Sequence, residues 1–302
     1  MRMTTCTNRS WIIGCGHIGQ RVSHLLQASG EQVYATSHST ASAKNLQKAG
    51  VTVFQVNLDK AGIFNNPDFE QAKMYYFVPP QKTGETDQRM LCFLQSLNPQ
   101  KPPRRIVYIS TTGVYGNHDG KWITENTPAK PENARSKRRL HAENALIQFC
   151  HNTGTDYIIL RVAGIYDCVK LPLARINAGI KILKPDIAPA SNRIHAADLA
   201  SICVAAMQSQ HRNCIFNVAD GNPSSISDYF IKTARFFALT PPTEIDMSEA
   251  EQVLSAEMLS YLRESKKIDN RLLLTKLNIS LKYPDLTAGL TACKKADDNS
   301  HT

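Results

Sequence analysis

Apolar runs alternate along this chain with stretches that place apolar side chains every three or four positions. Residues 11–13 form one such run, and Val22, Leu25 and Leu26 follow at helical spacing. Because strands that are apolar on both faces are typical of a parallel sheet between helices, and crossovers are right-handed, we expect an α/β fold with a doubly wound parallel sheet of the Rossmann type. The pattern predicts strands over 11–13, 32–36, 51–57, 73–78, 105–110, 156–162 and 214–218, and helices over 20–28, 41–49, 86–97, 134–150 and 196–207.

The pattern changes in the second half of the chain. Residues 167–193 contain three prolines and no clear period, whereas helices are expected over 226–238 and 249–263. Ser248 and Glu251 have the spacing of a capping box for the second of these helices. We therefore expect a Rossmann domain over 1–166, completed by 194–222, a smaller C-terminal substrate lobe over 167–193 and 223–290, and a disordered polar tail over 291–302.

A glycine-rich loop lies between the first expected strand and the first expected helix. Gly14, Gly16 and Gly19 follow the pattern G-x-G-x-x-G, in which the first glycine permits a tight turn, the second lets a pyrophosphate approach the backbone, and the third lets helix and strand pack closely. In this context the loop favours dinucleotide binding over a purely structural turn. The expected cofactor contacts here are Gly14, Cys15, Gly16, His17, Ile18, Gly19 and, after the fourth strand, Val78.

The end of the second expected strand bears on the choice of cofactor. An acid at this position would bind the ribose 2′-hydroxyl of NAD, but the chain has Thr36, Ser37 and His38 there, with Lys44 nearby. These side chains can donate to a phosphate without repelling it, so we expect NADP to be favoured over NAD. Turn-forming hydroxyls without a ligand remain the alternative.

Composition narrows the class of protein. The chain has 302 residues, 42% of them hydrophobic, and a net charge of +9, which suits anionic ligands such as nucleotides. The densest basic run, over 135–139, has no interleaved aromatic residues, so we predict no binding to nucleic acid and interpret the run as a solvated helix face. No signal peptide or membrane segment is expected, and the predicted location is cytoplasmic.

Cysteines and histidines suggest no metal centre. The eight cysteines include no C-x-x-C pair, so we expect reduced and mostly buried thiols. The nine histidines show no H-E-x-x-H pattern, and His195 is expected to be a packed, hydrogen-bonded residue.

Seven motifs together resemble a known family. The chain resembles an extended short-chain dehydrogenase/reductase of the NAD(P)-dependent epimerase/dehydratase family, in its atypical bacterial form, over residues 10–290. The resemblance implies a Rossmann fold, a nicotinamide cofactor and a C-terminal substrate lobe, and it places Asn57 where the family contacts adenine. The motifs are the glycine loop, S-T-T-G-V-Y-G (110–116), N-A-R-S-K (133–137), L-R-V-A-G-I-Y (160–166), R-I-H-A-A-D-L-A (193–200), F-N-V-A-D (216–220) and S-K-K-I-D-N (265–270).

The family's catalytic residues carry over only in part. By register, Thr111 takes the place of the hydroxyl residue and Lys137 that of the lysine, but Asn133 stands where the family has its tyrosine. Lys137 could also donate to the hydroxyls of the nicotinamide ribose, and a solvated lysine is the alternative. An amide cannot act as a general acid or base near neutral pH. Tyr115 could take over the proton transfer, although a packed tyrosine is the alternative. Arg193 is the candidate for binding an anionic group of the substrate.

Two functions are compatible with an asparagine in place of the family's tyrosine. The first is an oxidoreductase, epimerase or dehydratase acting on a sugar nucleotide or another small carbonyl or hydroxyl compound. The second is a catalytically idle NAD(P)-binding sensor or scaffold. Asn133 is the residue that distinguishes the two functions. The sequence also leaves a homodimer open.

Overall fold

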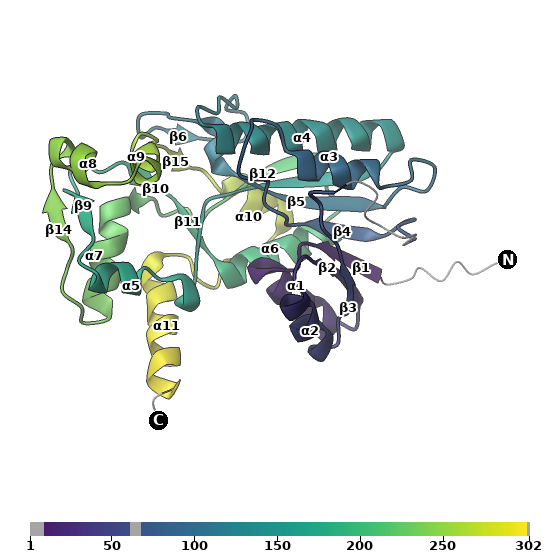
Figure 1. Ribbon diagram of the computed structural model, residues 1–302, viewed down its shortest axis with the longest axis horizontal. Coiled ribbons are helices and arrows are strands. Elements are labelled where there is room, and N and C mark those ends of the chain that lie inside the picture. The colour runs from purple at the N-terminus through teal and green to yellow at the C-terminus, as the bar shows by residue number, and fades with distance from the viewer. Residues whose placement is uncertain (1–8, 61–67, 301–302) are drawn as a thin grey trace. The chain divides into compact units, whose positions relative to one another are not determined.

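The computed structural model describes residues 9–60 and 68–300 (Figure 1). The chain forms two compact units. The first unit comprises residues up to 111 together with 134–161 and 199–216, and the second comprises 112–133, 162–198 and 217–302. None of the described helices combines the length and the hydropathy that a membrane span requires.

A seven-stranded sheet organises the first unit. Its order is β12-β7-β5-β4-β1-β2-β3, and β1 pairs in parallel with β2 and β4, as do β2 with β3 and β4 with β5. This confirms the doubly wound parallel sheet. The strands are β1 (Arg9–Ile13), β2 (Gln32–Ser37), β3 (Thr52–Gln55), β4 (Lys73–Tyr76), β5 (Arg105–Thr111), β7 (Asp156–Val162) and β12 (Cys214–Val218), whose last two residues belong to the second unit.

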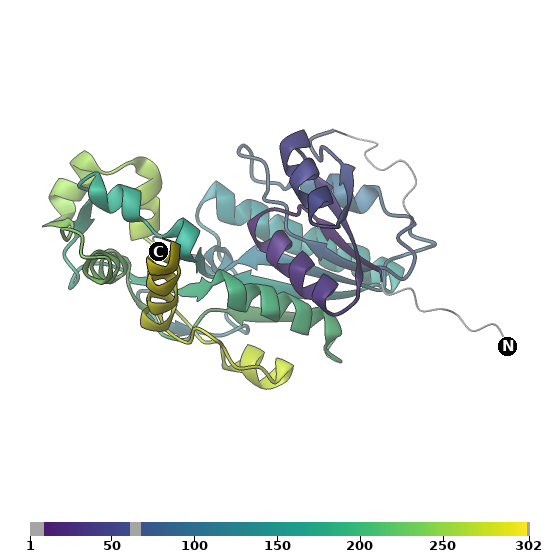
Figure 2. The same cartoon turned by 90° about the horizontal axis from the view of Figure 1, so that it is seen from below.

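Helices cover both faces of this sheet. In Figure 1, α3 (Gln88–Gln95) and α4 (Ala134–Thr153) lie on one face. On the other lie α1 (His17–Ala28), α2 (Thr40–Lys48) and α6 (Ala196–Gln208), and Figure 2 shows the purple α1 and the green α6 on that side. The core beneath α3 and α4 is apolar, because alternate residues of the strands, such as Trp11, Met74 and Ile106, are buried against the two helices.

The second unit is built from short elements. Its strands form two-stranded pairs, β8 with β11, β9 with β14, β10 with β13 and β6 with β15. These strands are β6 (Trp122–Ile123), β8 (Gly164–Tyr166), β9 (Lys181–Leu183), β10 (Ala190–Ser191), β11 (Arg193–His195), β13 (Ser224–Ser225), β14 (Thr243–Ile245) and β15 (Lys267–Ile268). Its helices are η1 (Thr112–Tyr115), η2 (Cys168–Lys170), α5 (Leu173–Asn177), α7 (Ile226–Phe236), α8 (Met247–Val253), α9 (Ala256–Leu262), α10 (Arg271–Leu277) and α11 (Leu286–Ser300).

The single helix expected over 249–263 is wrong. Two helices, α8 and α9, take its place, and the extended backbone of Leu254 and Ser255 separates them. The capping box expected at Ser248 and Glu251 is also wrong, because α8 already begins at Met247. Ser255 instead caps α9, since its hydroxyl accepts a hydrogen bond from the Met258 amide at 3.2 Å.

The disordered tail expected over 291–302 is wrong for its described part. Residues up to Ser300 continue α11, because Leu286, Leu290 and Cys293 are buried against Tyr166 and its neighbours. Residues 301–302 lie outside the described residues.

The expectation of reduced thiols throughout is also wrong. Cys168 and Cys293 form a disulfide, with their Cα atoms 4.9 Å apart, which joins η2 to α11. The sequence could not reveal this pair, because 125 positions separate its members. Cys6 lies outside the described residues, and the structure gives no disulfide among the other five cysteines.

Candidate functional site

The glycine loop connects β1 to α1 in the first unit. Gly14 has a φ of +86°, and a Cβ atom at this position would lie 2.6 Å from Cγ2 of Val78. Glycine is therefore required both for the backbone conformation and for the close approach of the segment that follows β4. Cys15 is buried, and this burial raises the pKa of its thiol to about 12, so the thiol stays protonated at neutral pH.

Gly16 and Gly19 meet two other requirements of a dinucleotide loop. A Cβ atom on Gly16 would have no described heavy atom within 4 Å, so a ligand can approach the backbone there. A Cβ atom on Gly19 would lie 3.1 Å from Ile12 Cγ2, which explains the close packing of helix on strand. No described side chain caps α1, whose N-cap is Gly16, and its first turn has no acidic residue. The first turn of α1 can therefore donate amide N–H groups to a pyrophosphate.

The side chains at the ends of β2 and β3 mostly support their own loops. Thr36 Oγ1 accepts a hydrogen bond from the Gly14 amide at 2.9 Å, and the Ser37 hydroxyl donates to the Ser39 carbonyl at 3.2 Å. His38 is exposed. Asn57 Oδ1 accepts from the Asp59 amide at 2.9 Å. Thr36 thus holds the glycine loop in place, whereas Ser37 and Asn57 bond within their own turns.

Thr111 and Lys137 both belong to the first unit. Thr111 ends β5 and is partly buried, whereas Lys137 lies in the first turn of α4, where Nζ donates to Glu85 Oε1 at 2.7 Å. Two arginines of the basic run point inward, because Arg138 donates to the Gly84 carbonyl and Arg139 to the Ile109 carbonyl. The interpretation of the run as a solvated helix face is therefore wrong for these two residues.

Tyr115 and Asn133 belong to the second unit. Tyr115 is fully buried, and its hydroxyl donates to Asn217 Oδ1 at 2.7 Å, which is the packed arrangement named as the alternative. Asn133 is partly buried, and its Nδ2 donates to Glu264 Oε1 at 2.7 Å. Asn133, which stands where the family has its tyrosine, is thus hydrogen-bonded to a carboxylate 131 positions further along the chain.

Glu264 belongs to a buried polar cluster. Its Oε2 atom accepts from Lys266 Nζ at 2.8 Å, and the same ammonium donates to the Gly116 carbonyl at 2.7 Å. The exposed fractions of the two side chains are 13% and 6%. We call Asn133, Glu264 and Lys266 the Glu264 cluster. Sequence reasoning missed Glu264 and Lys266, although the S-K-K-I-D-N motif that begins at Ser265 marked this segment.

Three asparagines hold the segment that carries this cluster. The Ser265 amide donates to Asn117 Oδ1 at 2.9 Å, and Asn192 bonds to the Lys266 carbonyl and the Ile268 amide, both at 2.8 Å. Further along, Asn270 Nδ2 donates to the Ala219 carbonyl at 2.8 Å. Segments that are far apart in the sequence therefore meet within the second unit.

Arg193 is buried in β11 of the same unit. Its Nη1 donates to Ser224 Oγ at 2.8 Å, its guanidinium carbon lies 5.1 Å from the centre of the Tyr229 ring, and Nη2 has no hydrogen-bond partner among the described residues. Burial raises the pKa of nearby Asp220 to about 6, while the Asn222 amide and the positive charge of Arg193 act in the opposite direction. His195 packs against Tyr283, with ring centres 3.9 Å apart.

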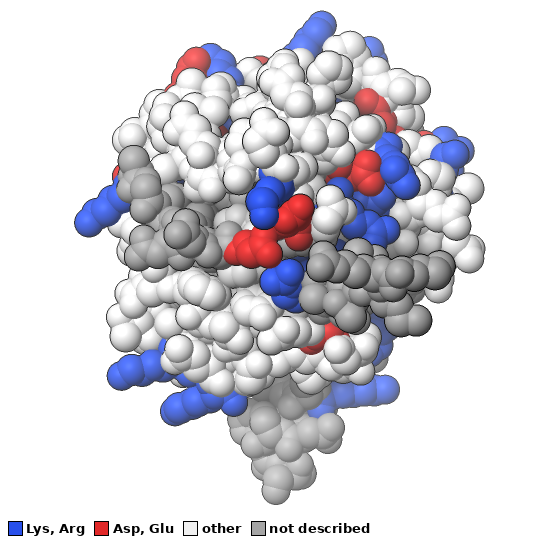
Figure 3. Space-filling model, turned by 90° about the vertical axis from the view of Figure 1, so that its right-hand side faces the viewer, with Lys and Arg blue, Asp and Glu red and all other residues white. Residues whose placement is uncertain are grey.

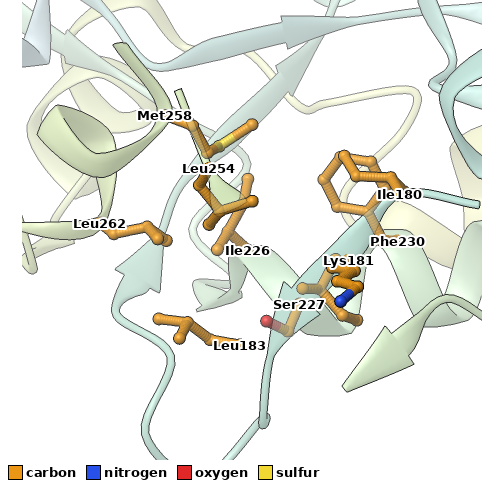
Figure 4. A pocket seen from close by; sticks show the side chains of 10 residues that line it. Ile180, Lys181, Leu183, Ile226, Ser227, Phe230, Leu254, Met258 and Leu262 are labelled. Atoms are coloured by element: carbon orange, nitrogen blue, oxygen red, sulfur yellow. The ribbon is translucent and has the colours of Figure 1, made fainter. Parts of the chain in front are cut away.

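An apolar pocket lies elsewhere in the second unit. It encloses about 260 Å³ of empty space, open solvent included, and Figure 4 shows side chains from β9, α7 and the α8–α9 segment around it. Lys181 and Ser227 are its polar members. A lining of this kind supplies no acid–base pair, so the pocket is not where we place the chemistry. The apolar lining residues are Ile180, Ile182, Leu183, Ile226, Phe230, Leu254, Met258 and Leu262.

Charge and metal-ligand geometry add little to the site. Basic and acidic side chains lie among one another on the face shown in Figure 3, where the described atoms form no single basic patch. Among the described residues, no group of three His, Cys, Asp or Glu side chains could hold a metal ion.

Comparisons with known proteins give the family. No curated protein sequence matches the chain significantly. A conserved protein of unknown function from Silicibacter pomeroyi is 26% identical, with a TM-score of 0.82 over 95% of this chain and 98% of that chain. Two more distant structures share the fold. UDP-glucose 4-epimerase from Thermotoga maritima, bound to UDP-glucose, is 16% identical, with a TM-score of 0.74 over 97% of this chain and 100% of that chain. UDP-glucuronic acid 4-epimerase from Bacillus cereus, bound to NAD, is 16% identical, with a TM-score of 0.71 over 93% and 96% of the two chains.

A model of the NAD-dependent epimerase/dehydratase family matches residues 12–219, more than half of the sequence, and the chain therefore belongs to that family.

Proposed function

We propose that this protein binds a nicotinamide dinucleotide at the glycine loop and uses it as an oxidoreductase, epimerase or dehydratase. The observation that carries the proposal is the division of roles among Gly14, Gly16 and Gly19, with open space at Gly16 beside an uncapped helix N-terminus. The residues present fit the cofactor, because the pyrophosphate needs both amide donors and room. When bound, the cofactor would accept or donate a hydride.

The chain's own residues would hold the cofactor and the substrate. Val78 would line the cofactor site, Lys137 would exchange Glu85 for the ribose hydroxyls, and Ser37 and His38 would meet the adenosine ribose. Without an acid at the end of β2, NADP is the favoured form. Thr111 would hydrogen-bond the reacting oxygen of a sugar nucleotide or another small hydroxyl or carbonyl compound. Within the second unit, Arg193 is the candidate for binding an anionic group.

The second candidate is a cofactor-binding sensor or scaffold without turnover. Asn133 favours it, because an amide replaces the residue that would exchange a proton with the substrate. Under this candidate the protein binds cofactor but reduces none with a sugar nucleotide, and Asn133→Tyr creates turnover that the parent lacks.

Calorimetry with NADP and NAD tests cofactor binding. We expect micromolar or tighter binding of NADP and several-fold weaker binding of NAD. Gly16→Asp should abolish both, because a carboxylate would occupy the open space and repel the pyrophosphate, whereas Gln208→Glu, which adds the same charge at an exposed position of α6, should bind like the parent. A parent protein that binds neither cofactor would refute the proposal.

A further inference from the structure

We propose that Arg89 makes the cofactor site accept a 2′-phosphorylated dinucleotide, because its guanidinium neutralises the carboxylate of Asp59. The inference rests on the proposed function and deepens it, since it names a residue that determines which form of the cofactor is preferred. Every contact on which it depends lies within the first unit.

The Asp59 carboxylate lies in the turn that follows β3, beside the end of β2. The two strands are parallel neighbours, and the Val56 amide donates to the Ser37 carbonyl at 3.0 Å. The hydrogen bond from Arg89 is the main cause that lowers the pKa of the Asp59 carboxyl, and the positive charge of His38 acts in the same direction, so His38 is within electrostatic range. An unpaired carboxylate here would repel a 2′-phosphate that approaches the end of β2.

Arg89 holds this carboxylate with two hydrogen bonds. From the first turn of α3, Nε donates to Asp59 Oδ1 at 2.6 Å and Nη2 donates to Oδ2 at 2.8 Å. A bidentate pair of this kind has a better-defined geometry than a single contact between two flexible side chains. The exposed fractions of the Arg89 and Asp59 side chains are 26% and 45%. The carboxylate would therefore act on a nearby anion if the guanidinium were removed.

Both members of the pair are anchored to the segments around the glycine loop. Arg89 Nη1 donates to the Pro79 carbonyl at 3.0 Å, and Val78, the residue before Pro79, is the one in close contact with the first glycine of the loop. A second residue of α3 holds the turn after β3, because the Cys92 thiol donates to the Lys60 carbonyl at 3.1 Å. These contacts keep the two charges together.

The pair explains how a site with an acid close by could still favour NADP. While Arg89 is present, the pair carries no net charge, and the Ser37 hydroxyl and His38 can donate to a 2′-phosphate. Without the guanidinium, the Asp59 carboxylate would oppose the phosphate and leave NAD almost unaffected. Because the effect is electrostatic and partly exposed to solvent, salt should weaken it.

Calorimetry with NADP and NAD, at low and at high salt, tests this role. Arg89→Met should lower the ratio of NADP affinity to NAD affinity by about threefold to tenfold at low salt, and by less at high salt. The double variant Asp59→Asn/Arg89→Met should restore the parent's ratio, because it leaves no unpaired charge. Asp59→Asn alone leaves the cation unpaired and should raise the ratio.

The matched control is Arg212→Met. It removes the same charge from another partly exposed ion pair of the first unit, with Asp156, next to β12 at the opposite edge of the sheet. We expect this variant to keep the parent's ratio at both salt concentrations. Thermal unfolding of all variants checks the fold, and Asp59→Asn, which keeps the side-chain volume, tests the inference even if Arg89→Met does not fold.

Three outcomes would count against the inference. A ratio that is unchanged in Arg89→Met and in Asp59→Asn, with both cofactors bound, overturns it and leaves the proposed function standing. A lowered ratio that the double variant does not restore also overturns it, because Arg89 would then act on the phosphate itself. A parent that binds neither cofactor overturns the inference together with the proposed function.

Discussion

At the scale of single residues, three glycines in one loop meet three different physical demands. Gly14 has a backbone conformation that L-residues with side chains rarely adopt, Gly16 leaves space for a ligand, and Gly19 lets α1 approach β1. Sequence spacing predicted all three roles, because the pattern encodes local backbone geometry. The opposite case is Glu264, whose contact with Asn133 no local pattern encodes.

Asp220 makes the stability depend on pH. Its side chain is buried, and its pKa is raised from 3.8 to about 6, so between about pH 4 and pH 6 the folded state binds a proton that the unfolded state has lost. The free energy of unfolding from this group therefore falls as the pH rises through that window. A pKa difference of this size corresponds to about 3 kcal/mol in the free energy of unfolding.

Asp220→Asn should remove this pH dependence. The amide oxygen can still accept the hydrogen bond that the Asn222 amide donates to Asp220 Oδ1 at 2.9 Å. We expect the variant to gain stability relative to the parent as the pH rises from about 4 to about 6, by up to roughly 3 kcal/mol. Urea unfolding of both proteins across that range measures the difference. A difference that is flat with pH would contradict the raised pKa.

At the scale of elements, the point where a helix begins depends on which polar residue occupies the N-cap position. The pattern at Ser248 and Glu251 resembles a capping box, but the extended residues Leu254 and Ser255 divide the expected helix into α8 and α9. Ile245, Ala250 and Leu262 are buried in one small core, so tertiary packing stabilises two short helices there.

Serine-to-alanine substitutions at the two candidate caps should lower the free energy of unfolding by different amounts. Ser255→Ala should lower the free energy of unfolding by about 1 kcal/mol, because it removes the side-chain acceptor for the Met258 amide. Ser248→Ala should change it by less than about 0.5 kcal/mol, because Ser248 is exposed within α8. Urea unfolding of the two variants measures the difference. A larger loss of stability in Ser248→Ala than in Ser255→Ala would support the capping box at Ser248 and Glu251.

At the scale of the whole molecule, the C-terminal helix is joined to a distant segment of its own unit. The disulfide between Cys168 and Cys293 closes a loop of 125 positions, and Tyr166 packs against Leu286 and Leu290 beside it. Closing so long a loop restricts the unfolded chain, and native disulfides typically contribute about 2–4 kcal/mol.

Reduction of this disulfide should destabilise the protein. We expect a reductant to lower the thermal unfolding midpoint of the parent, and Cys168→Ser to show the lowered midpoint with or without reductant. The structure gives no disulfide among the five other described cysteines, so the described residues offer no second disulfide to reduce. Peptide mass mapping without reduction should show the 168–293 link. An unchanged midpoint on reduction, or the absence of the linked peptide, would contradict the assignment.

The sequence by itself determined the strands and helices of the Rossmann sheet, its doubly wound parallel class and the glycine loop. These features depend on the period of apolar side chains and on glycine spacing, which act over one turn or one strand. The tertiary structure alone decided the Glu264 cluster, the course of α11 and the disulfide. Each joins residues more than a hundred positions apart, and such contacts depend on the path of the whole chain, which no local period records.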